Sequence, residues 1–149
     1  MPNPKARAAA LNASPEDAEA QFYDALRDGD LDRVMAVWAD DDDVLCVHPG
    51  GARMVGPQSV RAAFEAIFAN GHIAVHPEHV KRMQAMGSAV HSVLERVDVV
   101  TADGPRTGWI VATNVYVKTS HGWRMVAHHA SPGAPDEIPE IADAPSVLH

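Results

Sequence analysis

The sequence of 149 residues holds one cysteine, Cys46, so it cannot form an internal disulfide, which fits a reducing cytoplasm. Basic residues are few: 12 Lys and Arg stand against 20 Asp and Glu, and the net charge of −8 argues against nucleic-acid binding. No apolar run approaches the ~18 residues of a membrane span, and the N-terminal alanine run is too short for a signal sequence. We therefore expect a cytoplasmic protein with no nucleic-acid or membrane partner.

What is present is typical of one globular domain, with 46% hydrophobic and 21% charged residues and no internal repeats. Residues 1–13 are rich in Ala, Pro and Asn and lack a period, so we expect a flexible arm there. Residues 132–149 carry Pro, Asp and Glu without periodicity and are expected to form a tail. The folded domain should span residues 14–131.

Helix signals dominate the first half of the chain. Ser14 can cap a helix with Pro15 at its first position, and Gly29 ends this helix. Asp30 caps a second helix with an apolar face through Trp38. A third helix is predicted roughly at residues 58–69, where apolar residues share one stripe.

Strand signals dominate the second half. Segments 73–80, 88–100, 108–118 and 123–130 are rich in β-branched residues, with hairpin signals at Asp103-Gly104 and His121-Gly122. Helices followed by consecutive antiparallel strands indicate an α+β fold. Segment 108–118 is apolar at both alternating sets of positions, so both faces of the sheet should be covered. Helices would cover one face, and a second subunit in a homodimer would cover the other.

His48 is the first candidate site residue. It follows the apolar run Val44-Leu45-Cys46-Val47, which is typical of a buried strand, and it precedes Pro49 and two glycines. Pro49 restricts His48 to an extended conformation, which places an imidazole on a rigid turn at the end of a buried strand. A pocket position and a purely structural role are both open for it. Cys46, inside the run, is expected to be a small buried hydrophobe.

The order and spacing of several short motifs resemble the nuclear transport factor two-like superfamily, which includes SnoaL-like cyclases and ketosteroid isomerases. The second half also resembles the association domain of calcium/calmodulin-dependent protein kinase type II. The resemblance covers roughly residues 15–133, and these motifs carry it: Gly29-Asp30-Leu31-Asp32, Trp38-Ala39-Asp40-Asp41, His48-Pro49, Gly56, Gly104-Pro105-Arg106-Thr107, Gly122-Trp123, His129 and Ser131. It implies a cone-shaped α+β barrel, with three N-terminal helices packed on a curved antiparallel sheet around an apolar pocket. The fold hosts many functions.

The resemblance permits a comparison with ketosteroid isomerase, which uses an Asp base and an oxyanion hole of a Tyr and a protonated Asp. The base position falls on His48, which can act as a base, and the protonated-Asp position falls on Asn114, whose amide can donate. Both are therefore candidate catalytic residues. The Tyr position falls on Phe22, which cannot donate, and Tyr23 would point about 100° away on a helix. Steroid isomerisation by the known route is not expected.

The same resemblance suggests further residues in contact with a ligand. Phe22, Trp38 and Tyr116 are candidates, although large aromatic residues of this kind are more often core. His129 matches the association-domain histidine and would line the pocket or its mouth, while His128 would face the opposite side, since neighbours on a strand alternate. Arg106 lies in a matching motif, with an exposed charge as the alternative.

Nine histidines raise the question of a metal site. His72, His76 and His79 lie close in sequence, but no cysteine pair or His-Glu-x-x-His pattern accompanies them. We expect neither a metal nor a cofactor. The run Asp40–Asp43 is expected to be a solvated turn.

Three functions stay open on the sequence. The pocket would bind a small carbonyl- or carboxylate-bearing metabolite, with or without turnover. Alternatively, the protein is an isomerase, cyclase or dehydratase with His48 as general acid/base. The third possibility is an oligomerisation domain like the kinase association domain.

Overall fold

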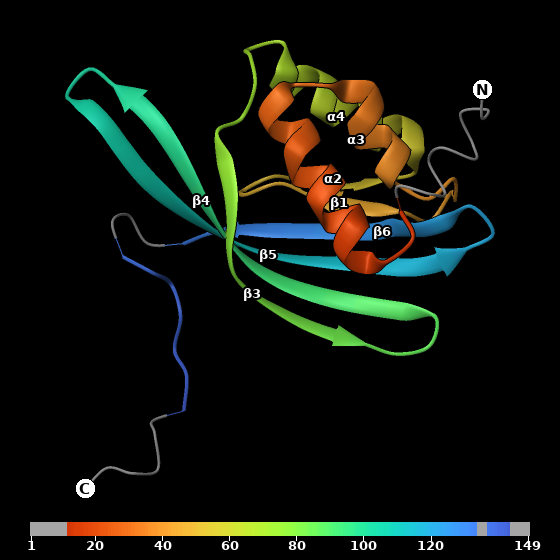
Figure 1. Cartoon of the computed structure of the whole chain (residues 1–149). Coiled ribbons are helices and arrows are strands. Elements are labelled where there is room, and N and C mark those ends of the chain that lie inside the picture. Colours follow the sequence, from red (N-terminus) through yellow and green to blue (C-terminus); the bar gives the residue numbers. More distant parts are fainter. Residues whose placement is uncertain (1–11, 134–136, 144–149) are drawn as a thin grey trace, which may run out of the picture.

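The computed structural model describes residues 12–133 and 137–143, so most of the expected arm and part of the expected tail lie outside the described residues. In this part of the chain, three helices and six strands form an α+β fold (Figure 1). The helices are α2 (Pro15–Asp28), α3 (Leu31–Val37) and α4 (Pro57–Phe68). The strands are β1 (Leu45–Val47), β2 (Arg53–Val55), β3 (Val75–Gln84), β4 (Ser88–Thr101), β5 (Gly104–Thr119) and β6 (Gly122–Pro132). The predicted class is confirmed.

The helix boundaries follow from local capping chemistry. The Ser14 hydroxyl accepts a hydrogen bond from the backbone N–H of Asp17 at 3.1 Å, which starts α2. Gly29 ends the same helix in a left-handed conformation at φ 63°, where its N–H bonds carbonyls of the last turn. Asp30 then caps α3 by accepting from the N–H of Arg33 at 3.2 Å. These signals are local, and the predicted helices are accordingly present within a residue or two.

The strands form one sheet in the order β2-β1-β6-β5-β4-β3. All neighbours are antiparallel except β1 and β6, which pair in parallel from Leu45 opposite Ala127 to Val47 opposite His129. The expected purely antiparallel sheet is thus corrected to a mixed one. Hairpins enforce antiparallel pairing, and no hairpin joins β1 to β6, so their relative direction is set by the path of the whole chain. The short strand β2 was not predicted.

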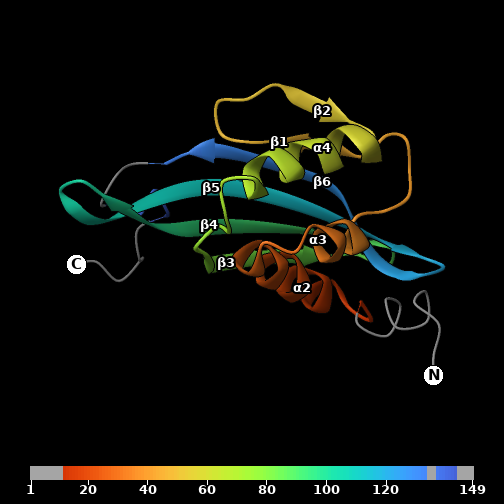
Figure 2. The same ribbon diagram turned by 90° about the horizontal axis from the view of Figure 1, so that it is seen from above.

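The sheet is open, because β2 and β3 lie at opposite ends of its strand order. The expected barrel is therefore not closed within the described residues. The helices pack on one face of this sheet, and the strands twist and fan outward beneath them (Figure 1 and Figure 2). We call the face toward the helices the inner face and the opposite one the outer face.

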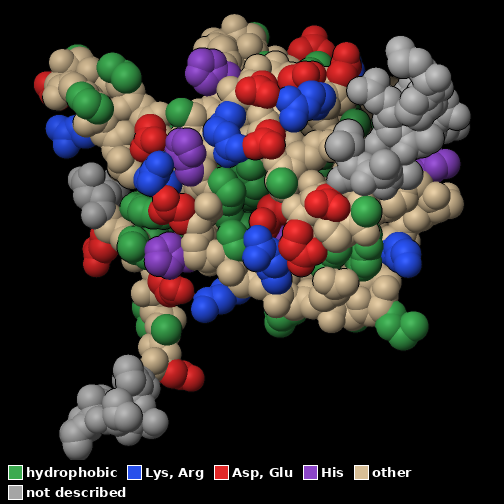
Figure 3. Space-filling view, viewed as in Figure 1, with side chains coloured by type: hydrophobic (Ala, Val, Ile, Leu, Met, Phe, Trp, Pro, Cys, Tyr) green, Lys and Arg blue, Asp and Glu red, His purple; other side chains and the backbone are tan. Residues whose placement is uncertain are grey.

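The hydrophobic core lies between the helices and the inner face. It is built from apolar side chains of all three helices and the central strands, among them Phe22, Val34, Phe64, Val93, Ala112 and Met125. No helix in the described residues is both long and apolar enough to cross a membrane. On the surface, charged side chains of both signs are interspersed over the helices, and hydrophobic ones cluster at the tip of the β4–β5 hairpin (Figure 3).

Candidate functional site

A row of polar side chains crosses the inner face of the sheet. His91 on β4 pairs with Asn114 on β5, which in turn pairs with His128 on β6. Directly paired residues point to the same face, and all three side chains are buried. Polar groups in the middle of an apolar face need hydrogen-bond partners. The partners of this row define the site.

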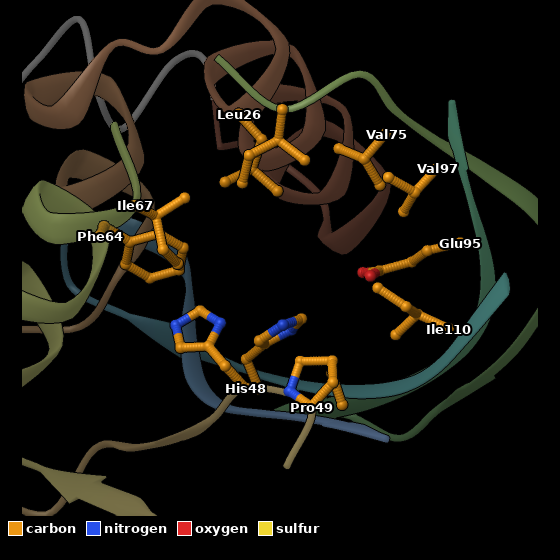
Figure 4. A pocket seen from close by; sticks show the side chains of 12 residues that line it. Leu26, His48, Pro49, Phe64, Ile67, Val75, Glu95, Val97 and Ile110 are labelled. Atoms are coloured by element: carbon orange, nitrogen blue, oxygen red, sulfur yellow. The ribbon is translucent and has the colours of Figure 1, made fainter. Parts of the chain in front are cut away.

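A cavity of about 170 Å³ lies beside the row, between the helices and the inner face (Figure 4). We call it the central cavity. Its apolar wall comes from both layers of the fold and includes Leu26, Phe64, Ile67, Val75, Ile110 and Ala130. Three titratable side chains face it as well: His48, Glu95 and His128. An apolar wall with a few convergent polar groups is typical of a small-molecule site.

His48 follows β1 at the edge of the central cavity, which is the pocket position that the sequence left open beside a structural role. Its carbonyl accepts the N–H of Gly51 at 2.9 Å, which closes the turn. The ring packs edge-on against Phe64, with 5.0 Å between ring centroids, and its Nε2 lies 3.5 Å from the Cys46 sulfur. Burial lowers the pKa of His48 below its ordinary value, so the ring is neutral at pH 7. The imidazole is thus positioned by weak contacts and keeps its capacity as a base.

Glu95 on β4 points its carboxyl group into the central cavity, opposite His48 (Figure 4). The side chain is only 5% exposed, and burial raises its pKa to about 7, although the hydrogen bond from Tyr23 acts in the opposite direction. A carboxyl group with this pKa exchanges a proton readily at neutral pH. The sequence analysis missed Glu95. The sequence does contain a signal for it. Side chains alternate between the two faces of a strand, so Glu95 points to the same inner face as Ala89, His91 and Val93.

Tyr23 connects Glu95 to the polar row. The Tyr23 hydroxyl donates to Oε2 of Glu95 at 2.7 Å and accepts from Nδ2 of Asn114 at 2.9 Å. On its other side, Oδ1 of Asn114 lies 2.5 Å from Nδ1 of His128. Burial, together with the charge of Glu95, raises the pKa of Tyr23 well above its ordinary range, so the hydroxyl keeps its proton. Four side chains from α2, β4, β5 and β6 therefore form one buried hydrogen-bonded chain.

His128 lies at the end of this chain and lines the central cavity. Burial lowers its pKa to about 3, helped by the neighbouring His48 and His129. Its ring centroid is 6.0 Å from that of His48 and 5.2 Å from that of Phe22. The ring is consequently uncharged at neutral pH.

The expected facing of the two neighbouring histidines is corrected. His128 faces the helices, whereas His129 is exposed on the outer face. The cause is a β-bulge: Tyr116 pairs with Met125 but Val115 pairs with Ala127, so β6 carries one extra residue. Before the bulge the odd-numbered residues Trp123 and Met125 point inward, and after it the even-numbered residues His128 and Ala130 do.

The structure places the other predicted residues away from the cavity wall. Asn114 uses its amide nitrogen for the hydrogen bond to Tyr23 and its amide oxygen for the contact with His128, and it does not line the cavity. Phe22 is core and packs edge-on against Phe64 and Tyr23. Arg106 is exposed on β5, near the tip of the β4–β5 hairpin. These three residues thus do not line the central cavity, whereas Glu95 does.

Trp38 and Tyr116 are also buried outside the central cavity. Trp38 forms a bridge to Met125 and lines a separate hollow of about 550 Å³ with Asp40 and Arg124. The ring of Tyr116 packs against that of His91, with 4.8 Å between centroids. For both residues the core alternative agrees with their burial.

A second polar pair lies one turn of α2 away. Glu19 accepts from Nδ1 of His91 at 2.9 Å and from the guanidinium of Arg82 at 2.7 Å. Burial opposes ionisation of Glu19, but these two hydrogen bonds outweigh it and the pKa lies below its ordinary value. Glu19 and Tyr23 are four positions apart on α2, so the helix presents two polar groups to β4 in succession. Glu19 thus supplies a partner for Nδ1 of His91, the third member of the polar row, whereas Nε2 of His91 has no hydrogen-bond partner among the described residues.

In the described part of the chain, no three His, Cys, Asp or Glu side chains converge as metal ligands would. His76 lies 3.4 Å from Asp98 at the surface, and His79 sits at the bulge of β3 with φ 47°.

The chain resembles known proteins in both sequence and fold. A family described as the SnoaL-like domain matches residues 16–135. The chain is 39% identical to a candidate calcium/calmodulin-dependent protein kinase type II association domain from Thiobacillus denitrificans, with a TM-score of 0.74 over 82% of this chain and 97% of that one. A candidate dehydratase of the NTF2-like family from Streptomyces avermitilis is 27% identical, with a TM-score of 0.69 over 78% and 92% of the two chains.

A ketosteroid isomerase-like protein from Erwinia carotovora atroseptica shares the fold at 17% identity, with a TM-score of 0.66 over 85% of this chain and 97% of that one. The comparison with curated protein sequences gave no match. The resemblance to SnoaL-like and nuclear transport factor two-like proteins is confirmed.

Proposed function

We propose that this chain, which belongs to the SnoaL-like domain family, binds a small uncharged carbonyl compound in its central cavity. The observation that carries the proposal is the carboxyl group of Glu95, which is buried in an apolar cavity with a pKa of about 7. A protonated carboxyl group donates a hydrogen bond, and a carbonyl oxygen is its natural acceptor. The apolar wall would hold the rest of the ligand.

A carbonyl group suits the cavity better than a carboxylate. The described residues that line the cavity include Glu95 and two histidines that burial keeps neutral, but neither Lys nor Arg. A buried anion without a cationic partner is costly, and the charge of ionised Glu95 would add repulsion.

The volume of the cavity limits the ligand further. An apolar protein cavity of about 150 Å³ holds benzene, and the central cavity has about 170 Å³. Drug-sized ligands occupy roughly 300–1,000 Å³. We therefore propose a single six-membered ring or a chain of similar size, enclosed by the cone that the helices and the inner face would form.

Binding of cyclohexanone, a ketone of this size, tests the proposal. In ¹⁵N-labelled protein it should shift the amide signals of residues around the cavity, and Ala130→Leu should abolish the shifts because it fills the cavity. Ala127→Leu, on the outer face of the same strand, is the matched control and should bind normally. Absence of any shift at millimolar ketone, or shifts elsewhere on the molecule, would refute this function.

A second candidate function is proton transfer beside the carbonyl group. It is favoured by the presence of a proton acceptor, neutral His48, and a carboxyl group that can give a proton, Glu95, in the same cavity. His48 would take a proton from the carbon next to the carbonyl, while Glu95 gives its proton to the oxygen to form the enol. His48 then gives its proton to the γ carbon of the dienol while Glu95 recovers its own proton from the oxygen, which yields the conjugated isomer.

Conversion of cyclohex-3-enone to cyclohex-2-enone, followed by ultraviolet absorbance, measures this activity. His48→Gln should abolish turnover and leave the melting temperature nearly unchanged, because the ring makes only weak contacts. If the wild-type protein binds the ketone without converting it, the catalytic role is refuted and the binding role stands. A His48→Gln variant that loses stability instead of turnover would assign the residue a structural role.

Assembly is the third role, and we propose a homodimer through the outer face, in the cytoplasm. Trp109, Val111, Val115 and Val117 alternate on β5 with the inward-facing Ile110, Ala112, Asn114 and Tyr116, so their side chains lie on the outer face, and each is half-buried. None of the described helices covers this face. An uncovered apolar face favours a partner. Sedimentation should show a dimer at micromolar concentration, and Val111→Lys should yield monomers, whereas Ala62→Lys on α4 should not. Wild-type monomers would contradict the proposal.

A further inference from the structure

The hydrogen-bonded chain from Glu95 to His128 has a direction. Its links are Tyr23 to Glu95 at 2.7 Å, Asn114 to Tyr23 at 2.9 Å, and His128 to Asn114 at 2.5 Å. All four residues are buried, at no more than 5% exposure. Each link is a direct contact between buried side chains, so the donors and acceptors along the chain must match one another.

Glu95 determines that direction. Its Oε2 accepts from Tyr23 in the carboxylate, and equally in the acid when the proton is on Oε1 and directed to the ligand, so the single hydrogen of the Tyr23 hydroxyl goes to Glu95. The Tyr23 oxygen then needs a donor, which the NH₂ group of Asn114 supplies. The amide of Asn114 is thereby oriented with its oxygen toward His128, and an amide oxygen only accepts. Nδ1 of His128 must consequently carry the proton.

A neutral imidazole has one N–H, so a proton on Nδ1 leaves a lone pair on Nε2. His128 is neutral because burial lowers its pKa to about 3. Since Nδ1 is turned to Asn114, Nε2 is the ring nitrogen left for a ligand in the cavity that His128 lines.

We propose that Tyr23 and Asn114 are positioning residues that hold His128 in the Nδ1–H tautomer, so that its Nε2 accepts a hydrogen bond from a hydroxyl or enol group of the ligand. This inference rests on the proposed binding function and deepens it. The ligand is a small ring compound that carries an O–H donor, or a ketone that acquires one in its enol form. The polar end of the site thus selects ligands by the direction of their hydrogen bonds, and the apolar wall selects them by size.

The tautomer is measured without any ligand. In ¹⁵N-histidine-labelled protein at pH 8, His128, assigned by comparison with His128→Gln, should show a protonated Nδ1 and an unprotonated Nε2. Tyr23→Phe removes the middle link at constant shape and should give a mixture of both tautomers. Thr113→Val is the control, because it removes a hydroxyl from the exposed outer face of the strand that carries Asn114, and it should leave the tautomer unchanged.

Two probes of equal size then test the ligand. With the two tautomers about equally populated in Tyr23→Phe, binding of phenol should weaken about two-fold, because only the Nδ1–H form accepts its hydroxyl, and binding of toluene should be unchanged. A protonated Nε2 in the wild type, or equal phenol affinity in wild type and Tyr23→Phe, would overturn the inference while toluene binding upholds the cavity. Failure of both probes to bind would overturn the ligand site itself, and the tautomer measurement would still decide the role of Tyr23 and Asn114.

Discussion

The carboxyl group of Glu95 should make the free energy of unfolding depend on pH. Its pKa is about 7 in the folded protein, against an ordinary value of 4.5 for an exposed glutamate. The folded state therefore binds one more proton than the unfolded state between these values, and stability falls as the pH rises through this window. Below about pH 4.5, and again above about pH 7, both states carry the same charge at this position and the contribution is constant.

The magnitude follows from the two pKa values. Their difference of about 2.5, at ~1.4 kcal/mol for each pH unit, corresponds to a total loss of about 3.5 kcal/mol, of which about 3 kcal/mol falls between pH 4.5 and pH 8. Glu95→Gln removes the titration and preserves an acceptor for the Tyr23 hydroxyl. Relative to Glu95→Gln, the wild type should lose about 3 kcal/mol of unfolding free energy between pH 4.5 and 8.

Urea denaturation at half-unit steps of pH, followed by tryptophan fluorescence, gives this difference directly. Other titrating groups, such as Glu19 and His128, contribute to both proteins and cancel. Glu65→Gln, at an exposed position on α4, is the control and should run parallel to the wild type. A difference between wild type and Glu95→Gln that stays constant from pH 5 to pH 8 would refute the argument, because Glu95 would then titrate alike in both states.

Three further outcomes are expected. Tyr23→Phe should raise the pKa of Glu95 further, since the carboxylate loses a hydrogen-bond donor. An NMR titration of the Glu95 carboxyl carbon measures this pKa, and an unchanged value would contradict the 2.7 Å contact. Phe22→Ala should cost about 3–5 kcal/mol of unfolding free energy in urea, because the ring is fully buried between α2, α4 and the sheet, and a loss below about 1 kcal/mol would contradict that packing. Ser14→Ala should cost about 1 kcal/mol through loss of the α2 cap, with Ser59→Ala on the exposed face of α4 as the neutral comparison.

The sequence determined the elements whose causes are local. A capping serine, a proline and a left-handed glycine delimit α2, and the spacing of apolar residues identifies α3, α4 and the long strands. The position of His48 beside the cavity was predictable for the same reason, since the apolar run before it and Pro49 after it set the local backbone. Each of these signals acts over a few residues.

The tertiary structure decided which side chains meet. Tyr23 is 72 positions from Glu95 and 91 from Asn114, and the angle of α2 across the sheet selects Tyr23 instead of Phe22 for this contact. A single bulged residue in β6 decides that His128 faces the helices while His129 faces outward. Even the acidity of Glu95 arises from burial between two layers that approach only in the folded protein. Local sequence specifies caps and periodicity, whereas register, helix orientation and dielectric surroundings depend on contacts between distant segments.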